Sequence, residues 1–271
     1  MIVTSASNRL SDEQLETYSR EGFLILDENV FAPEKFERLK THFEEKLAAL
    51  DPTYRTEALD VPHFTDPALF EWLFADEVLD LVEPIIGPNI ALWSSGFISK
   101  PKGDGKRVPW HEDSAYWKGY LEPMEVVTLW LAVDASTTEN GCMRVVPRTH
   151  DDGFSDYVPV DTAKNVFPTE ISRIEQFDRL SVPCELQPNQ ASLHHGKLIH
   201  GSPPNTSQKR RCGYTMRYMP TSVKFNSEKM AGMHQIYLGR GHDLAGNAYA
   251  DPTRSYEELD FVRRNSGKKL H

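Results

Sequence analysis

A pair of histidines and an aspartate have the types and the spacing that a metal ion needs. His111 and Asp113 flank Glu112, and His200 follows far downstream. On an extended strand, residues two apart point to the same face, so His111 and Asp113 can reach one ion while Glu112 points away. Two imidazoles and one carboxylate occupy one face of an octahedral ion and leave the opposite positions open, as is typical of non-haem Fe(II) oxygenases. The pattern predicts a catalytic metal centre at His111, Asp113 and His200.

An arginine downstream of His200 could anchor a second reactant. Arg211 lies eleven positions after His200 (211 − 200 = 11). A guanidinium group binds a carboxylate with two parallel hydrogen bonds and stays charged when buried, so Arg211 is a candidate anchor for the remote carboxylate of 2-oxoglutarate. Arg210 is the competitor, because adjacent strand residues face opposite ways and only one of the two can point inward.

The second histidine of the metal set also has competitors. His194 and His195 precede His200, and either could be the ligand or a histidine near a turn. We prefer His200 because Gly201 and Ser202 follow it, and because 203–205 then makes a sharp turn before the strand of Arg211.

The elements that must position these residues fall into two groups. A capping box at 11–14 predicts a helix that ends at Gly22 and leads into a short buried strand at 23–26. Pro33 suits the first turn of a second helix, and a third helical region spans 66–86. Strands are expected from residue 89 onward, at 90–93, 97–100, 126–133, 180–186, 191–195 and 211–219.

The order of these elements predicts the fold class. Helices followed by many short strands indicate a mainly β protein with N-terminal helices and a double-stranded β-helix (jelly-roll) core. We expect one domain over 1–271, with a helical layer at about 1–88, the β core at about 89–220 and a C-terminal extension at 221–271. The long polar loop at 150–178 is of a kind that often covers a site.

Composition narrows the possible partners and the compartment. The chain has 271 residues, 39% hydrophobic and 26% charged, which is an ordinary globular balance. A net charge of −10 disfavours a nucleic-acid partner. Cys142, Cys184 and Cys212 are too scattered for a disulfide framework, and no apolar run is long enough to span a membrane. The first residues lack the apolar core of a signal peptide, so we expect a cytoplasmic protein with a small-molecule substrate and no membrane partner. An oligomeric state is not predicted.

The span from Lys100 to Met219 resembles the phytanoyl-CoA dioxygenase family of Fe(II)/2-oxoglutarate oxygenases. The matching stretches are Lys100-Pro101, Trp110-His111-Glu112-Asp113, Tyr116-Trp117, Thr128-Leu129-Trp130, Glu139-Asn140-Gly141-Cys142, Val146-Pro147, Thr149-His150, and His200-Gly201-Ser202 through Asn205 to Arg211. The resemblance implies Fe(II) at His111, Asp113 and His200. It also implies a 2-oxoglutarate pocket lined by Arg211, Ser202 and Trp130, and a reaction in which O2 hydroxylates a substrate while 2-oxoglutarate becomes succinate and CO2.

The chain departs from the family pattern at two places. Glu112 stands where the family often has Gln, and Pro147-Arg148-Thr149-His150 replaces the usual Pro-Gly-Ser-His. These changes put in doubt a side-chain amide contact and the turn after that strand. Asp113, in place of Gly or Ala, leaves no position for a halide and argues against a halogenase. Alternatives to the dioxygenase are a jelly-roll metal-binding protein and a cupin-like metalloenzyme that does not use 2-oxoglutarate.

The substrate is the least determined part of the prediction. Family members act on acyl-CoA thioesters, amino-acid derivatives and other natural products. Tyr116 and Trp117 are expected to contact the substrate and, together with Trp110, to wall the pocket. Lys100 is expected to contact the substrate as well, because it belongs to a basic cluster near His111 that would suit an anionic group; the alternative is a solvated charged loop. If Arg211 points inward, strand alternation places Arg217 on the same face, where its charge needs an internal carboxylate or an anionic group of the substrate.

Overall fold

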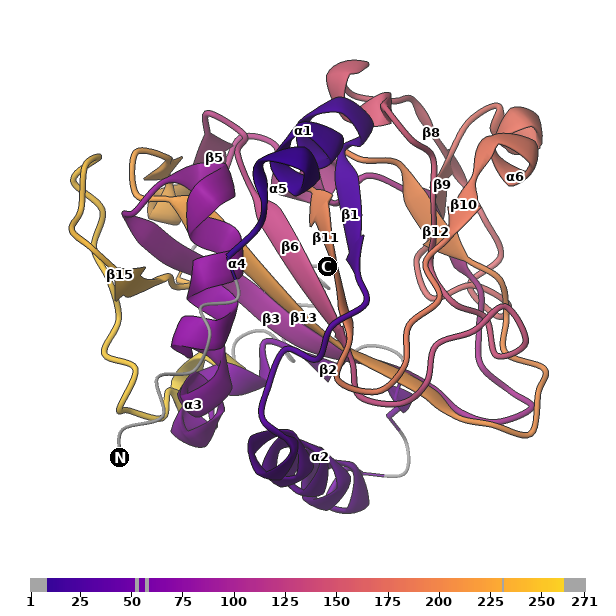
Figure 1. Ribbon diagram of the computed structural model, residues 1–271, viewed down its shortest axis with the longest axis horizontal. Coiled ribbons are helices and arrows are strands. Elements are labelled where there is room, and N and C mark those ends of the chain that lie inside the picture. Colours follow the sequence, from indigo (N-terminus) through magenta and orange to yellow (C-terminus); the bar gives the residue numbers. More distant parts are fainter. Residues whose placement is uncertain (1–8, 52–53, 57–58, 231, 261–271) are drawn as a thin grey trace.

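Antiparallel sheets form the centre of the computed structural model, which describes residues 9–51, 54–56, 59–230 and 232–260. The larger sheet has the strand order β1-β11-β6-β13-β3-β15, and β2 pairs with the same edge of β3 as β15, farther along that strand (Figure 1). Its strands are β1 (Phe23–Leu26), β2 (Leu59–Asp60), β3 (Ile90–Lys100), β6 (Val127–Ala132), β11 (Ala191–His195), β13 (Arg211–Pro220) and β15 (Tyr237–Arg240).

A smaller sheet, with the order β10-β7-β12-β4, lies at the right of Figure 1. Its strands are β4 (Val108–His111), β7 (Arg144–Val145), β10 (Val182–Pro183) and β12 (His200–Ser202). Two short pairs complete the strands of the described residues: β5 (Leu121–Glu122) with β14 (Lys224–Phe225), and β8 (Tyr157–Pro159) with β9 (Thr169–Ile171).

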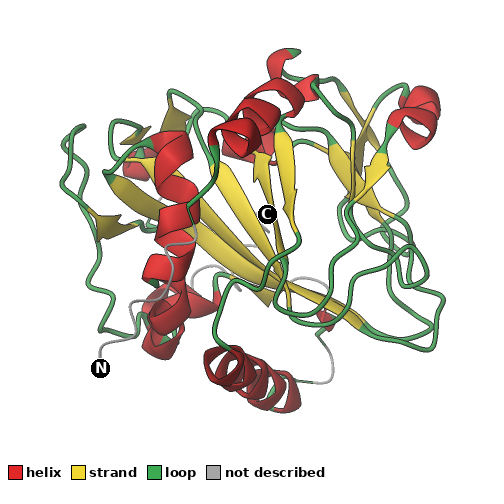
Figure 2. Cartoon of the chain, in the orientation of Figure 1, coloured by secondary structure: helices red, strands yellow, loops and turns green. Residues whose placement is uncertain are grey.

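Helices precede most of the strands along the chain (Figure 2). The α-helices are α1 (Asp12–Glu21), α2 (Pro33–Ala48), α3 (Phe70–Leu73), α4 (Asp76–Ile86), α5 (Asp113–Trp117) and α6 (Phe177–Leu180). Short 3₁₀ helices span Pro62–Phe64, Pro67–Leu69, Thr149–Asp151, Ile174–Gln176 and Ser227–Met230.

The N-terminal helices begin and end as their sequences predict. Ser11 accepts a hydrogen bond from the backbone N–H of Gln14, whose side chain accepts one from the backbone of Ser11, and α1 ends at Gly22 in the left-handed conformation with φ 80°. Pro33 occupies the first turn of α2. No helix among the described residues is both long and apolar enough to cross a membrane.

Alternation along the central strands separates the main core from the site. Val127, Leu129 and Leu131 of β6 belong to the same buried cluster as Leu39 and Phe43 of α2. The residues between them, such as Thr128 and Trp130, therefore face the other way, toward the small sheet. One face of the large sheet thus packs against helices, and the opposite face carries polar and charged side chains.

Some segments differ from the expectation. The strands expected at 90–93 and 97–100 are one continuous strand, β3, because β13 pairs along its whole length. The helical region expected at 66–86 is divided by Ala75, whose backbone is extended. The loop expected at 150–178 contains the β8–β9 pair and α6, and the segment after residue 220 adds β15 to the large sheet.

Candidate metal centre and co-substrate pocket

The small sheet brings the predicted metal ligands together. His111 is the last residue of β4 and His200 the first of β12, and the two lie directly opposite each other in the antiparallel pairing. Asp113 begins α5, so our expectation that it lies on a strand is wrong. Glu112 has an extended backbone, with φ −114° and ψ 129°. The chain changes direction after this residue, and Asp113 lies beside His111. The helix then turns the chain away from the site.

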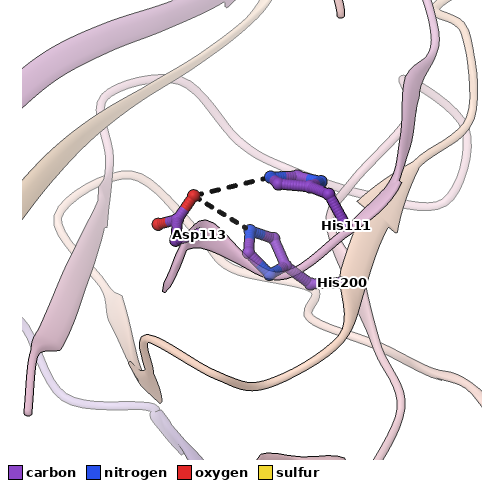
Figure 3. Close-up of side chains that lie close together, drawn as sticks. All are labelled: His111, Asp113 and His200. Atoms are coloured by element: carbon purple, nitrogen blue, oxygen red, sulfur yellow. Dashed lines mark ion pairs between the residues drawn. The ribbon is translucent and has the colours of Figure 1, made fainter. Parts of the chain in front are cut away.

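The three side chains point toward one another (Figure 3). His111 Nε2 lies 3.5 Å and His200 Nε2 lies 3.9 Å from the same oxygen, Asp113 Oδ1. One ligand atom from each residue falls within 4.8 Å of the others, and all three residues are buried. Among the described residues this is the one group of His, Cys, Asp or Glu side chains with this geometry.

Backbone carbonyls fix the tautomer of both imidazoles. His111 Nδ1 lies 2.8 Å from the carbonyl oxygen of Pro109, and His200 Nδ1 lies 2.9 Å from that of Leu198. A carbonyl can only accept, so each Nδ1 carries the hydrogen and each Nε2 keeps its lone pair for a metal ion. Burial, followed by repulsion from His111, lowers the pKa of His200 well below its usual value, so its imidazole is neutral as a ligand must be.

Arg217 holds the carboxylate of Asp113. Its Nε donates to Asp113 Oδ2 over 3.1 Å, which leaves Oδ1 turned toward the imidazoles. Burial alone would raise the pKa of Asp113, but Arg217 and the two histidines outweigh it and hold that pKa well below its ordinary value. Asp113 is therefore ionised and oriented as a single-oxygen ligand. The partner that the sequence required for Arg217 is thus an internal carboxylate.

A second group of polar residues lies farther along β13, at Arg211. Arg211 Nε and Nη2 donate to the carbonyl oxygen of Gly141 over 3.2 and 2.9 Å, and Nη2 also lies 3.3 Å from Ser202 Oγ. Lys100 is opposite Arg211 in the β3–β13 pairing, and its Nζ donates to Ser202 Oγ over 2.7 Å. Two cations and a hydroxyl group therefore meet at Ser202.

Arg211 is a buried cation that has no carboxylate partner among the residues that the structure describes. Its side chain is only 2% exposed, and burial lowers its pKa to about 10. A buried guanidinium that lacks a counter-ion is costly, and a carboxylate of a bound molecule would supply one. The residues present therefore fit the remote carboxylate of 2-oxoglutarate.

Trp130 forms the wall beside this arginine. The guanidinium carbon of Arg211 lies 5.3 Å from the centroid of the Trp130 ring. The indole can lie there because Gly213 has no side chain, since a Cβ at that position would come within 2.0 Å of Trp130 Cζ2. Arg210 points to the opposite side of the sheet, where it pairs with Asp134 and Glu44.

One cavity connects the metal cluster with these residues. Its lining includes His111, Asp113, His200, Trp130, Ser202, Arg211 and Arg217. The 2-oxoglutarate candidates and the metal candidates thus share a single space, with Arg217 on the side of the metal and Lys100 beside Arg211.

The aromatic residues expected to wall the pocket lie in three different places. The Tyr116 ring is 5.9 Å from that of His111, while Trp117 packs in a neighbouring apolar cluster with the Arg217 guanidinium 5.6 Å from its ring. Trp110 was expected at the pocket, and that expectation is wrong: it packs with Phe177 on the outer side of the small sheet, because it alternates with His111 along β4.

Phe167 and His194 line the cavity, although the sequence did not single them out for that position. The Phe167 ring lies edge-on to His111 at 4.9 Å, and it comes from the long polar segment whose lack of periodicity hid it. His194 faces His200, with 4.9 Å between ring centroids, but it is not part of the cluster that could hold a metal ion. His195 lies instead beside His150, with 5.5 Å between the ring centroids and the rings tilted by 49°.

Glu112 holds the long segment in place. Its Oε1 accepts from the backbone N–H of Ser155 over 2.6 Å, and its own N–H donates to the hydroxyl of Tyr157 over 3.1 Å. The residue between the two predicted ligands therefore points away from the metal site, as the alternation of the chain indicated, and it reaches the segment that covers the site.

Known proteins resemble this chain in sequence and in fold. The model of the family described as Phytanoyl-CoA dioxygenase (PhyH) matches residues 18–213. The chain is 34% identical to Phytanoyl-CoA dioxygenase domain-containing protein 1 of Danio rerio over 145 residues, which are 52% of this chain and 47% of that protein. It is 27% identical to the peroxisomal Phytanoyl-CoA dioxygenase of Bos taurus over 292 aligned positions, covering 98% of this chain and 80% of the relative.

A solved structure has a similar fold. The structure of CytC3 with Fe(II) and alpha-ketoglutarate superposes with a TM-score of 0.63 at 24% identity, covering 90% of this chain and 95% of that one. The first relative is matched over about half of its length and the second over most of it. The family model covers well over half of the chain and both halves of the candidate site up to Gly213. The chain therefore belongs to the phytanoyl-CoA dioxygenase family of Fe(II)- and 2-oxoglutarate-dependent oxygenases.

Proposed function

We propose that this chain is an Fe(II)- and 2-oxoglutarate-dependent dioxygenase that hydroxylates a small-molecule metabolite and releases succinate and CO2. One observation carries the proposal. Two imidazoles and one ionised carboxylate converge in the same cavity as Arg211, a buried cation without a carboxylate partner among the described residues. A metal centre alone would not need this cation, and a carboxylate-binding pocket alone would not need the ligand set.

The residues divide into two functional groups. His111, Asp113 and His200 would hold Fe(II) through Nε2, Oδ1 and Nε2, and this ligand set would leave room on the ion for the co-substrate and O2. Arg211 and Ser202 hold the remote carboxylate of 2-oxoglutarate, with Trp130 as the wall beside it. When bound, the iron and 2-oxoglutarate supply the oxidising chemistry, and the protein supplies position and a water-poor pocket.

The surroundings of the site adjust its electrostatics. Arg217 keeps Asp113 ionised and turned toward the iron position, and Phe167 shields His111 from solvent. Lys100 adds a second positive charge beside Arg211, which suits the dianionic co-substrate better than the substrate. Tyr116 and Trp117 are proposed to contact the substrate from α5.

Two facing sheets support a jelly-roll description of the core. Along the chain β3, β6, β11 and β13 enter the large sheet, whereas β4, β7, β10 and β12 enter the small one. We propose that these strands form a double-stranded β-helix within a single domain, with the two histidines of the metal set on the small sheet, Asp113 at the start of α5 and Arg211 on the large sheet. A cytoplasmic location stays a prediction, and the Bos taurus relative is named as peroxisomal.

A screen of 2-oxoglutarate turnover tests the function. Anaerobically iron-loaded protein is mixed with 2-oxoglutarate, O2 and individual metabolites, and succinate release is measured. We expect a low basal rate that one class of metabolite increases, and no succinate from the Asp113→Ala variant. Protein that binds iron but forms no succinate under any condition would favour a metalloenzyme that does not use 2-oxoglutarate.

A further inference from the structure

A row of buried polar side chains crosses the floor of the cavity on the metal side. His194 of β11 lies directly opposite Thr128 of β6, and Thr128 lies directly opposite Arg217 of β13. Directly opposed residues of antiparallel strands point to the same face. All three therefore face the cavity side of the large sheet, and His194 and Arg217 line the cavity itself.

Both ends of this row touch the candidate metal ligands. The His194 ring lies 4.9 Å from the ring of His200, and Arg217 Nε lies 3.1 Å from Asp113 Oδ2. The row is therefore beside the metal cluster. Arg211 is six positions from Arg217 along β13 (217 − 211 = 6), which is about 20 Å of extended strand. A molecule held by the row is distinct from one held by Arg211.

The row contains hydrogen-bonding atoms that nothing in the described part of the chain satisfies. Neither ring nitrogen of His194 has a partner, nor does Thr128 Oγ1, although the two residues are 2% and 0% exposed. Arg217 uses Nε for Asp113 and Nη1 for Thr215, and no described residue accepts from its Nη2. Each buried polar group left without a partner costs about 1–3 kcal/mol, so the row is built at a cost to stability.

The chemistry of the row indicates what would satisfy it. Both ring nitrogens of His194 lack a partner, and the one that carries hydrogen can donate to an oxygen of a bound group. Arg217 Nη2 and the Thr128 hydroxyl add donors. Several donors beside a guanidinium match an oxygen-rich, negatively charged group.

We propose that the row formed by His194, Thr128 and Arg217 binds a carboxylate of the substrate and so sets its position beside the iron. This inference rests on the proposed function and names the class of substrate, a small carboxylic acid. Arg217 then has two partners, the metal ligand Asp113 and the substrate. An ordered water could satisfy His194 and Thr128, but it would not make the cavity prefer an acid to an amide.

Calorimetry with matched probes tests the inference. Anaerobic protein is loaded with Fe(II) and saturating 2-oxoglutarate, so that Arg211 is occupied. It is then titrated with straight-chain monocarboxylates from acetate to octanoate and with the corresponding primary amides. We expect at least one acid to bind about tenfold more tightly than its amide, as expected for a charged hydrogen bond.

Two variants remove the orphaned atoms without removing volume. Thr128→Val and His194→Phe should each weaken binding of that acid about fivefold or more, because each removes a hydrogen bond. Neither should lower the thermal unfolding midpoint, since an unsatisfied polar group is replaced by an apolar one of similar size. His195→Phe is the matched control: His195 Nδ1 accepts from the backbone N–H of Lys197, so this variant should lose stability but bind the acid normally.

The outcomes separate the two proposals. If the wild-type protein does not bind 2-oxoglutarate at its iron, the proposed function fails. If it binds 2-oxoglutarate but shows no preference for acids over amides, only the carboxylate inference fails. The carboxylate inference is also overturned if Thr128→Val weakens binding of the acid by less than fivefold. If His194→Phe does not fold, Thr128→Val alone tests this inference.

Discussion

Replacing Arg211 by alanine should separate ligand binding from stability, because Arg211 is buried without a carboxylate partner among the described residues. Its pKa is lowered by burial to about 10 from the ordinary 12.5, a difference that corresponds to roughly 3 kcal/mol. At neutral pH the guanidinium is charged in both the folded and the unfolded state, so this cost weighs on the folded protein. A bound carboxylate relieves it.

The expected effect on binding is therefore large. Loss of one partner from a buried ion pair costs about 3–5 kcal/mol, so Arg211→Ala should weaken 2-oxoglutarate binding by roughly a hundredfold or more. Arg211→Lys should recover only part of the affinity because it lacks the planar fork that binds both carboxylate oxygens. Without 2-oxoglutarate, the alanine variant should unfold at a temperature close to that of the wild-type protein, since the removed charge offsets the lost contacts with Gly141 and Trp130.

Arg210 provides the matched control. It pairs with Asp134 and Glu44 on the other face of the sheet, with its side chain 26% exposed. Arg210→Ala should lower the free energy of unfolding by about 1–3 kcal/mol and leave 2-oxoglutarate binding intact. The assay is thermal unfolding of the Fe(II) protein under anaerobic conditions, with and without 2-oxoglutarate. If the co-substrate raises the unfolding temperature of Arg211→Ala as much as that of the wild type, but not that of Arg210→Ala, the assignment of the anchor is refuted.

Four other predictions have defined expected outcomes. Fe(II) binding, measured as metal per chain after gel filtration, should be nearly abolished in His111→Ala, Asp113→Ala and His200→Ala. His195→Ala should bind Fe(II) like the wild type. One Fe(II) per chain in His200→Ala would exclude His200 as a ligand. Gly213→Ala should displace Trp130, lower the free energy of unfolding in urea by about 1–3 kcal/mol and weaken 2-oxoglutarate binding. Wild-type stability together with wild-type affinity would contradict the close packing at this glycine. Glu112→Gln should leave protease resistance near residue 155 unchanged, because an amide oxygen can still accept from the backbone N–H of Ser155. Glu112→Ala should increase cleavage there. Equal cleavage in both variants would show that Glu112 does not anchor that segment. Arg210 lowers the pKa of Glu44 below its ordinary 4.5, so the stability that this pair contributes is present above that pH and is lost as pH falls through the lowered value. The difference in unfolding free energy between the wild type and Arg210→Gln should therefore shrink below about pH 4.5. A difference independent of pH would show that the pair is not responsible.

Residue types and strand alternation predicted much of the arrangement around β13. Alternation along an extended strand depends only on backbone geometry, so placing Arg211 and Arg217 on one face needed no knowledge of the fold. The β-bulge in the pairing of β13 with β3 comes after Arg217 and does not disturb this alternation. What alternation could not give is the partner of Arg217, because Asp113 approaches it from the start of α5, beyond the end of β4.

Other features depended on tertiary structure. Asp113 is the first residue of a helix and does not lie on a strand, because the chain turns at the end of β4. Phe167 comes from a segment without periodicity, and only the fold brings it to His111. From the sequence, His194 was considered as a possible metal ligand or as a histidine near a turn. Its orientation toward the cavity, together with its lack of partners among the described residues, is evident only once β11 is placed beside β6.

An anaerobic titration followed by absorbance tests the central claim most directly. Fe(II) is added to the protein, and 2-oxoglutarate then follows in the absence of O2. The account predicts one Fe(II) per chain and a weak visible charge-transfer band on addition of 2-oxoglutarate, with iron binding lost in Asp113→Ala and the band weakened in Arg211→Ala. Stoichiometric iron binding with no band in the wild-type protein at any 2-oxoglutarate concentration would contradict it.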